Sequence, residues 1–269
     1  MLEIKRLSPV IGAEVSGANL ISPNDDEFKE LEQALSEYSV LFFRDQPRLS
    51  PKQQFAFATQ CGPLHSHPAA PVLEDDEAIF VIKTDANSKV ANGNGWHTDV
   101  SCDNEPPLVT MLQLHQLPEP GGDTLFSSMY AAYETLSPKM KIFLADLDAS
   151  HESEHVYQGR YSDRGVEDKT EYPSSIHPIV ASHPISKRPS LYVNPSFTTG
   201  IKGLSEKEGQ TLLELLFTHQ SRPEFQVRFQ WTVNAIALWD NRSAQHFACL
   251  LYTSPSPRDR TRSRMPSSA

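Results

Sequence analysis

Gly95-Trp96-His97-Thr98-Asp99 is the segment of this 269-residue chain from which its fold and chemistry are best inferred. Side chains two positions apart in an extended backbone point to the same face, so we expect His97 and Asp99 to lie together. An imidazole and a carboxylate on one face can share a metal ion. A second histidine would complete a set that leaves coordination positions of Fe(II) open. Structural His and Asp residues in a turn would give the same short pattern, so the flanking sequence has to decide.

On both sides of this segment the chain alternates a few amphipathic helices with many short apolar runs. Residues 24–37 predict one helix with an apolar face, and capping boxes at Ser50 and Ser205 predict two more. Strands outnumber these helices, which favours a mixed but mainly β fold, an antiparallel sandwich or barrel with flanking helices. The runs typical of β-strands are residues 40–43, 78–83, 110–114, 124–127, 179–182, 191–194, 225–231 and 236–239.

The overall charge and the cysteines narrow the class of protein. A net charge of −10 argues against nucleic acid as a partner, because a phosphate-binding surface needs clustered Lys and Arg. No apolar run approaches the about 18–20 residues of a transmembrane helix, so we expect no membrane partner. Cys61, Cys102 and Cys249 are too few and too scattered for a disulfide framework, which favours a cytoplasmic protein.

Three further segments accompany Gly95–Asp99. They are a block over Ile11–Leu20, a Gly-Gly-Asp-Thr turn over Gly121–Thr124, and a Trp-Asp-Asn-Arg segment that leads to a histidine over Trp239–His246. In order and approximate spacing these segments resemble the taurine dioxygenase (TauD/TfdA) family of Fe(II)/2-oxoglutarate-dependent dioxygenases. Four motifs in order are far more specific than a histidine and an acid alone.

This resemblance implies a fold, a set of cofactors and a reaction. The fold would be a double-stranded β-helix, or jelly-roll, core with flanking α-helices, formed as one domain by residues 1–248. His97, Asp99 and His246 would bind Fe(II), with 2-oxoglutarate as co-substrate and O2 as oxidant. The enzyme would hydroxylate a small anionic organic substrate, of the sulfonate or sulfate-ester type, while it decarboxylates 2-oxoglutarate to succinate.

The same resemblance assigns roles outside the metal set. Thr124 matches the family threonine that binds the distal carboxylate of 2-oxoglutarate, although an ordinary strand start would also suit it. His67 matches a position that contacts the acidic head of the substrate, and the alternatives are a metal chelate formed with His65 and a plain surface histidine. Phe197 matches an aromatic residue that lines the substrate site, but an isolated Phe is more often a core residue. Trp239–Asn241 are expected to pack and hydrogen-bond near His246 without binding the metal.

Two departures from the family pattern bear on the substrate. Taurine-type members carry a tyrosine where this chain has Ala70, and an asparagine where it has Gly93. A site without these hydrogen-bonding groups should discriminate poorly for taurine. Another small sulfonate, a sulfate ester or a carboxylate of the aryloxyalkanoate type is therefore expected. The resemblance also implies a homo-oligomer, either a dimer or a tetramer.

Residues 249–269 differ in composition from the rest of the chain. They hold four arginines and one acid, Asp259, and the run Cys249–Asp259 resembles the translation of a transposase adapter used in DNA sequencing libraries. We therefore expect a non-native tail behind a truncated domain, without the family arginine that clamps 2-oxoglutarate. Such a chain would be a catalytically impaired homologue. In the alternative, the tail is a divergent one in which Arg258 or Arg260 binds the carboxylate.

Overall fold

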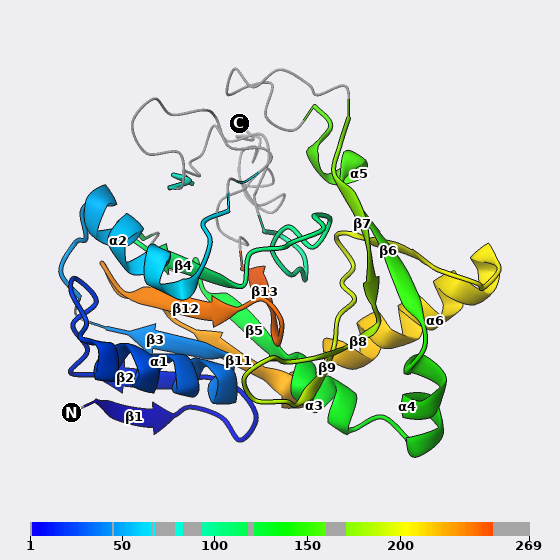
Figure 1. The fold of residues 1–269 in the computed structure, drawn as a ribbon, viewed down its shortest axis with the longest axis horizontal. Coiled ribbons are helices and arrows are strands. Elements are labelled where there is room, and N and C mark those ends of the chain that lie inside the picture. The colour runs from blue at the N-terminus through cyan, green and yellow to red at the C-terminus, as the bar shows by residue number, and fades with distance from the viewer. Residues whose placement is uncertain are drawn as a thin grey trace, which may run out of the picture.

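Two β-sheets face each other at the centre of the molecule (Figure 1). The computed structural model describes residues 2–44, 46–65, 67, 79–82, 93–117, 121–159 and 171–249. The first sheet, in the order β1-β2-β3-β12-β4, contains β1 (Glu3–Arg6), β2 (Ala13–Ser16), β3 (Val40–Phe43), β4 (Val109–Gln113) and β12 (Ile236–Asp240). The second, in the order β11-β5-β13, contains β5 (Thr124–Ser128), β11 (Gln226–Phe229) and β13 (Ala244–Ala248). Pairing is antiparallel throughout these two sheets, apart from the parallel contact between β2 and β3.

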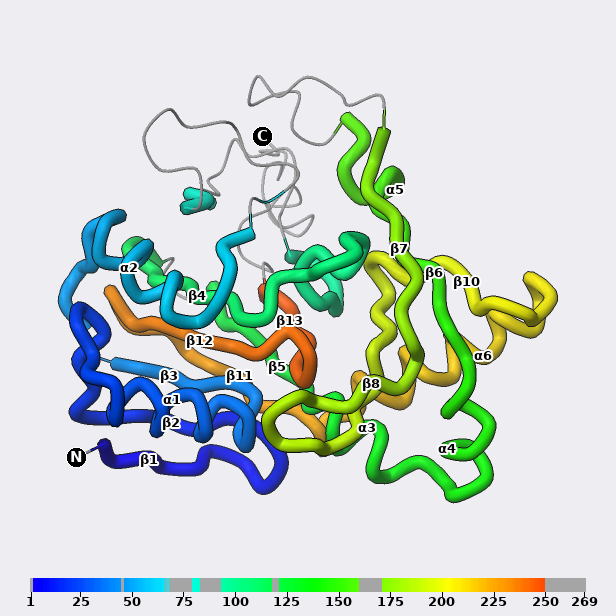
Figure 2. Tube along the Cα trace, viewed as in Figure 1, coloured from blue at the N-terminus to red at the C-terminus, as the bar shows by residue number. Residues whose placement is uncertain are grey.

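A second apolar core lies beside this sandwich, where the remaining strands pack against helices (Figure 2). Its sheets have the orders β10-β6-β7 and β8-β9, and they consist of β6 (Asp148–Glu152), β7 (Ser174–Pro178), β8 (Val180–Ser182), β9 (Pro189–Leu191) and β10 (Thr198–Ile201). Its helices are α3 (Met129–Glu134), α4 (Pro138–Leu144), α6 (Glu206–Gln220) and the short 3-10 helix Pro223–Phe225, whereas α5 (Glu154–Tyr157) packs in a separate cluster with Val100 and Phe197. No helix in the described part of the chain has both the length and the apolar character needed to cross a membrane.

The alternation of side chains along β12 separates the two sides of the first sheet. Trp239 points into the sandwich, where Phe42 of β3 stacks on Phe229 of β11 with ring centroids 4.0 Å apart. Leu238 points to the opposite side and packs with apolar residues of α1 (Asp25–Tyr38) and α2 (Pro51–Cys61). Neighbouring residues of one strand therefore serve two different layers.

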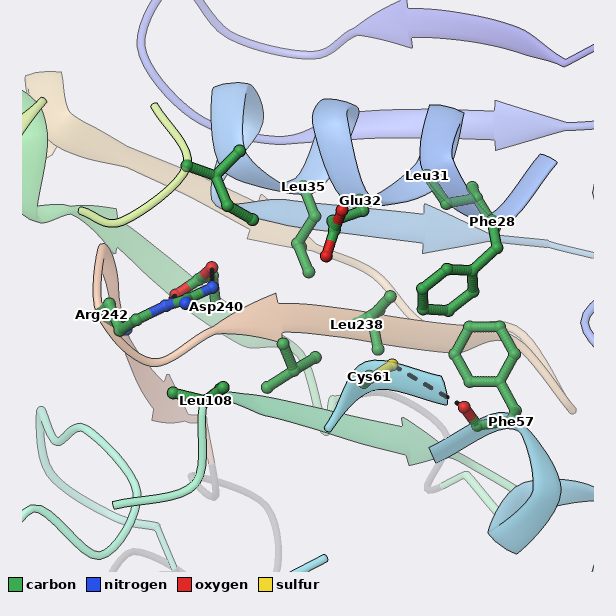
Figure 3. A pocket seen from close by; sticks show the side chains of 12 residues that line it. Phe28, Leu31, Glu32, Leu35, Phe57, Cys61, Leu108, Leu238, Asp240 and Arg242 are labelled. Carbon is green, nitrogen blue, oxygen red and sulfur yellow. Dashed lines mark hydrogen bonds and ion pairs between the residues drawn. The ribbon is translucent and has the colours of Figure 1, made fainter. Parts of the chain in front are cut away.

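Figure 3 shows a small cavity on the helix-facing side of β12. Its volume is about 70 Å³, and Leu31 and Leu35 of α1 and Phe57 of α2 line it together with Leu238. Its charged end is formed by Asp240 and Arg242, which already pair with each other. The cavity contains none of the sequence-predicted site residues.

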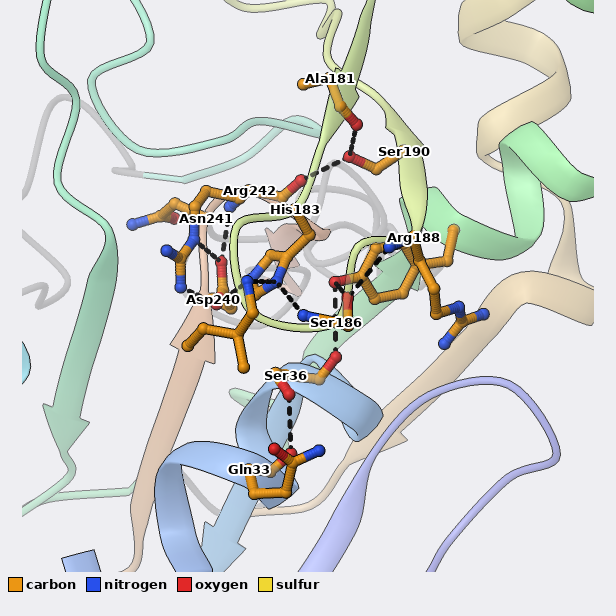
Figure 4. A network of polar contacts seen from close by, with 12 residues as sticks. Gln33, Ser36, Ala181, His183, Ser186, Arg188, Ser190, Asp240, Asn241 and Arg242 are labelled. Carbon is orange, nitrogen blue, oxygen red and sulfur yellow. Dashed lines mark hydrogen bonds and ion pairs between the residues drawn. The ribbon is translucent and has the colours of Figure 1, made fainter. Parts of the chain in front are cut away.

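The turn between β12 and β13 is fixed by a buried charge cluster (Figure 4). Asp240 accepts hydrogen bonds from the backbone N–H of Arg242 at 2.9 Å and from its Nε at 2.8 Å. His183 lies 2.9 Å from the second carboxylate oxygen, and its Nδ1 accepts the Ser186 N–H, so its Nε2 carries the proton donated to Asp240. Burial alone would raise the pKa of Asp240, but these bonds hold it below its usual value. The chain reversal before β13 is thereby tied to the β8–β9 hairpin.

Most of the predicted elements are present. The three predicted helices correspond to α1, α2 and α6, with capping boxes at Ser50 and Ser205, and the mainly β, antiparallel character of the fold is confirmed. Two strand expectations were wrong. Described residues 79–82 form no strand, and Val81 is 71% exposed. β9 ends at Leu191 because Asn194 turns the chain, its Oδ1 accepting the Ser196 and Phe197 N–H groups. The strands β1, β2, β6, β7, β10 and β13 were not anticipated.

His151 of β6 is a fully buried, neutral histidine. Burial and the neighbouring His177 lower its pKa to about 3, from an ordinary value of 6.5. His177 and Tyr192 pack against its ring, with centroids 5.2 Å and 5.9 Å away. Between pH 6.5 and pH 3 the unfolded chain therefore binds a proton at this residue that the folded chain does not.

Stability should consequently fall as the pH is lowered. The proton taken up by unfolded His151 costs about 2 kcal/mol of unfolding free energy between pH 7 and pH 5. Urea denaturation at the two pH values should therefore show a smaller loss for His151→Gln than for the wild type, by about that amount. Ser36→Ala, at a buried serine of α1 that does not titrate, is the control and should keep the wild-type pH dependence. Equal pH dependence in the wild type and His151→Gln would contradict this account.

Candidate metal centre

His97 and His246, far apart in the sequence, are brought together by a direct backbone bridge. The His97 N–H donates to the His246 carbonyl at 3.1 Å, and the His246 N–H donates to the His97 carbonyl at 2.9 Å. Residues opposed in an antiparallel pair project their side chains to the same face. The two imidazoles accordingly lie with ring centroids 4.0 Å apart.

Asp99 completes the group of three predicted residues. Its Oδ1 atom lies 3.7 Å from Nε2 of His97 and 3.7 Å from Nε2 of His246. One donor atom from each residue falls within 4.8 Å of the other two. The expectation that His97 and Asp99 lie on one side of the chain is met, although the chain turns at Asp99 and does not continue extended.

Neighbouring hydrogen bonds orient two of these side chains. Oδ2 of Asp99 accepts from Thr110 Oγ1 at 2.7 Å and from Trp239 Nε1 at 3.2 Å, so Oδ1 is left facing the imidazoles. Asn241 in turn donates to Thr110 Oγ1 at 2.9 Å. Nδ1 of His97 donates to the Gly95 carbonyl at 2.8 Å, which places the proton on Nδ1 and the lone pair on Nε2.

The protonation states are those that a cation site requires. Burial alone would raise the pKa of Asp99, but the imidazoles of His246 and His97 and the Thr110 hydrogen bond outweigh it, and the pKa lies below its usual value. Burial and repulsion from His97 lower the pKa of His246 to about 3. At neutral pH His246 is therefore neutral and Asp99 is a carboxylate, as binding of a cation requires.

This donor set fits a divalent transition-metal ion. Within the described residues, Nε2 of His97, Oδ1 of Asp99 and Nε2 of His246 make no hydrogen bond to the protein. Two nitrogen ligands and one oxygen ligand on one side of an ion leave its other positions open, as in oxygenases that use Fe(II). The residues present could hold such an ion.

Thr124 starts β5, beside the strand that carries His246. It pairs with Ala248 of β13, two residues beyond His246, whereas Phe126 pairs directly with His246. Because opposed residues share a face, Thr124 lies on the same side of the sheet as the His246 ring. Trp231 Nε1 donates to Thr124 Oγ1 at 3.0 Å, which leaves the threonine proton free to be donated elsewhere.

His67 and Phe197 belong to one aromatic group, which we call the aromatic wall and define as His67, Phe80, Tyr157 and Phe197. The His67 ring lies 5.1 Å from Phe80 and 5.6 Å from Tyr157, and Tyr157 lies 5.9 Å from Phe197. Val100, the residue after Asp99, packs in the same cluster as Tyr157 and Phe197. The wall therefore adjoins the turn that carries Asp99.

Gly93 lies where the two histidine-bearing segments meet. Its carbonyl accepts the Ala248 N–H at 2.9 Å, and its φ of +74° is one that few side chains tolerate. A Cβ at this position would come 3.3 Å from the Cβ of Ala248 and 3.5 Å from Cε1 of His97. Ala70, Arg258 and Arg260 lie outside the described residues.

Several contacts of the site were not predicted. The sequence did not identify Thr110, Trp231 or Tyr157 as site residues. A single residue in an apolar run does not show which distant group it contacts. Trp239 lies beside His246 and Asp99 as expected, and Asn241 reaches the site through Thr110, which bonds to Asp99. Asp240 was expected there too, but it points to the opposite side of β12 because adjacent strand residues face opposite ways.

Comparison with known proteins identifies the family. An alkylsulfatase of Acinetobacter baylyi is 35% identical over 92% of this chain and 80% of its own length. An (S)-phenoxypropionate/alpha-ketoglutarate dioxygenase of Sphingobium herbicidovorans is 32% identical over 98% of this chain and 92% of its own. The crystal structure of a taurine dioxygenase from Burkholderia xenovorans superposes with a TM-score of 0.77 at 33% identity, covering 92% of this chain and 82% of that one. The model of the taurine catabolism dioxygenase TauD, TfdA family matches residues 3–264, and the chain belongs to this family of jelly-roll dioxygenases.

Proposed function

We propose that this protein is an Fe(II)- and 2-oxoglutarate-dependent oxygenase that hydroxylates a small anionic organic substrate of the sulfonate or sulfate-ester type. The observation that carries the proposal is the convergence of His97, Asp99 and His246 on one point, with a lone pair of each unused by the described residues. Membership of the dioxygenase family supports it.

In this proposal the three residues hold the iron and determine its charge. When bound, Fe(II) supplies the activation of O2 that couples decarboxylation of 2-oxoglutarate to hydroxylation of a substrate C–H bond. Two neutral imidazoles and one carboxylate contribute a single negative charge, so the site keeps an excess of positive charge. That excess favours an anionic co-substrate.

The surrounding side chains keep the ligands in place and receive the co-substrate. Thr110 and Trp239 occupy one oxygen of Asp99 and so prevent the carboxylate from turning away from the imidazoles. Thr124, whose oxygen accepts from Trp231, would donate its proton to the distal carboxylate of 2-oxoglutarate. The aromatic wall would exclude water from one side of the substrate.

The substrate proposal follows from which side chains reach the aromatic wall. His67 would contact the acidic head of the substrate, and Phe197 would pack against its body. Gly93 offers no side chain to bind an amine, and the departure at Ala70 removes a second polar group. An alkyl sulfate ester or an unsubstituted sulfonate suits this site better than taurine. The phenoxypropionate dioxygenase relative favours, as second candidate, a carboxylate of the aryloxyalkanoate type.

We propose in addition a homo-oligomer, a dimer or tetramer, in the reducing environment of the cytoplasm. The cysteines Cys61, Cys102 and Cys249 are free, which agrees with such an environment. Ile142 and Phe143 of α4 expose apolar side chains that a contact between subunits would cover.

Residues 1–248 would form the domain, and residues 249–269 a tail that does not serve the site. The tail is rich in arginine, and its Pro255 and Pro257 would be unusual in a central strand. Without an arginine to clamp 2-oxoglutarate, the chain would bind its co-substrate weakly and act as an impaired homologue. The family match extends to residue 264, so the alternative role of Arg258 or Arg260 needs a direct test.

Anaerobic titration tests the metal assignment. The wild type should bind one Fe(II), and addition of excess 2-oxoglutarate should produce a weak visible charge-transfer band. His97→Ala and Asp99→Ala each remove one of three ligands, so iron affinity should fall by more than about 100-fold and the band should vanish. His219→Ala, a histidine of α6 that bonds the Ala132 carbonyl, is the control and should retain both. Unchanged iron binding in His97→Ala and Asp99→Ala would rule out the assignment.

The same titration tests the tail. If it serves no part of the site, Arg258→Ala and Arg260→Ala should leave the 2-oxoglutarate midpoint within about twofold of the wild type, as should the neighbouring Arg262→Ala. A bidentate arginine–carboxylate contact is worth about 1.5–3 kcal/mol, so its loss would weaken binding about tenfold or more. Weakening of that size in one of the first two variants would establish the alternative.

Product analysis tests the substrate class. Succinate and sulfite or sulfate release should be measured at saturating 2-oxoglutarate with hexyl sulfate, hexanesulfonate, taurine and 2-phenoxypropionate. The sulfate ester or the plain sulfonate should exceed taurine in kcat/KM by about tenfold or more, because the site lacks two groups that would bind the taurine head and amine. A preference for taurine would contradict the interpretation of Ala70 and Gly93. A preference for phenoxypropionate would establish the second candidate.

A further inference from the structure

The residue after Asp99 has a strained backbone. Val100 has a φ of +48°, a left-handed conformation that is an outlier for a β-branched residue. Such a conformation costs of order 1–3 kcal/mol and persists only where the surroundings enforce it. Because Val100 directly follows Asp99, its conformation sets the direction from which the carboxylate reaches the two imidazoles.

Hydrogen bonds to the next residue, Ser101, hold the backbone of Val100 in this conformation. Its hydroxyl accepts a hydrogen bond from Asn194 Nδ2 at 2.8 Å and lies 3.0 Å from Nδ1 of His151. Since His151 is neutral, its Nδ1 can accept the serine proton. Ser175 also donates to the Ser101 carbonyl at 3.1 Å. These bonds fix the orientation of the Ser101 hydroxyl and carbonyl. The side chains that form them are all buried: Ser101, His151, Ser175 and Asn194.

Asn194 serves the aromatic wall with the other end of its amide. Its Oδ1 accepts the Phe197 N–H at 2.9 Å and the Ser196 N–H at 3.1 Å. Ser196 Oγ donates to the Trp96 carbonyl at 3.2 Å, immediately before His97. Residues 194–197 therefore hydrogen-bond to the metal-binding segment at Trp96, before His97, and at Ser101, after Asp99. One buried amide spans the distance between the Asp99 turn and the Phe197 ring.

We infer that Asn194 is a positioning residue that couples the metal-binding turn to the aromatic wall. Through Ser101 it holds the Val100 conformation that directs Asp99, and through the Phe197 amide it fixes the ring that faces the substrate. The inference rests on the proposed function. A metal ion that fixes Asp99 should also order residues 194–197, and disorder in those residues should weaken the metal, because coupling between two sites is reciprocal.

Hydrogen exchange of the whole chain, with and without Co(II) as a redox-stable metal probe, tests the coupling. Co(II) should slow exchange at the Ser196 and Phe197 amides about fivefold or more in the wild type. In Ser101→Ala and Asn194→Ala this slowing should disappear, and Co(II) affinity should fall about tenfold. The visible absorption of bound Co(II), which reports ligand geometry, should change in both variants.

Ser36→Ala is the matched control. Ser36 is another buried serine, and its hydroxyl donates to the Gln33 carbonyl at 2.8 Å within α1, away from the wall. It removes the same group at a similar depth, so it should lower stability without altering Co(II) affinity, its spectrum or the slowing at residues 196 and 197.

The outcomes separate this inference from the proposed function. Wild-type protein that binds Co(II) through His97 but shows unchanged exchange at residues 196 and 197 would overturn the inference alone. So would a Ser101→Ala variant that behaves like Ser36→Ala. If Ser101→Ala does not fold, the wild-type comparison and Asn194→Ala still decide. Failure of the wild type to bind Co(II) at all would overturn the proposed function and the coupling with it.

Discussion

The antiparallel bridge between His97 and His246 is the constraint on which the rest of the site depends. Two backbone hydrogen bonds hold a loop residue against the middle of β13, and the imidazoles meet because opposed residues share a face. The register of β13 against β5 is therefore critical, since a slip of one residue would turn His246 to the other face. The buried charge cluster at Asp240 fixes the turn between β12 and β13, and so determines where β13 begins.

The features that could be predicted from sequence are local ones. Ser50 and Ser205 cap helices because each forms reciprocal bonds with a residue three positions on, and the run 236–239 is a short apolar segment typical of a strand buried on both faces. The metal residues were found through the resemblance of whole motifs. The bare pattern of His97 and Asp99 left a structural turn open. The sequence alone could not predict contacts between distant segments, such as those of Thr110 with Asp99 or Asn194 with Ser101. Those contacts depend on the completed fold and not on the neighbouring residues.

The protein and its proposed ligands both carry a negative charge. A chain with a net charge of −10 would repel a dianionic co-substrate and an anionic substrate unless a local positive potential outweighs it. Within the described residues the donor set holds one carboxylate and two imidazoles, and a bound divalent cation would supply positive potential there. In the proposed function the metal thus attracts both anions in addition to its part in the reaction.

The two faces of β12 separate the donor residues from the helical layer. Trp239 and the donor residues lie on one side, while Leu238, the small cavity and the helices α1 and α2 lie on the other (Figures 1 and 3). Strand backbone, already fully paired between β3 and β4, separates them. A substitution in the helical layer that leaves the Asp240 cluster intact therefore acts on the donor residues only through the backbone of β12.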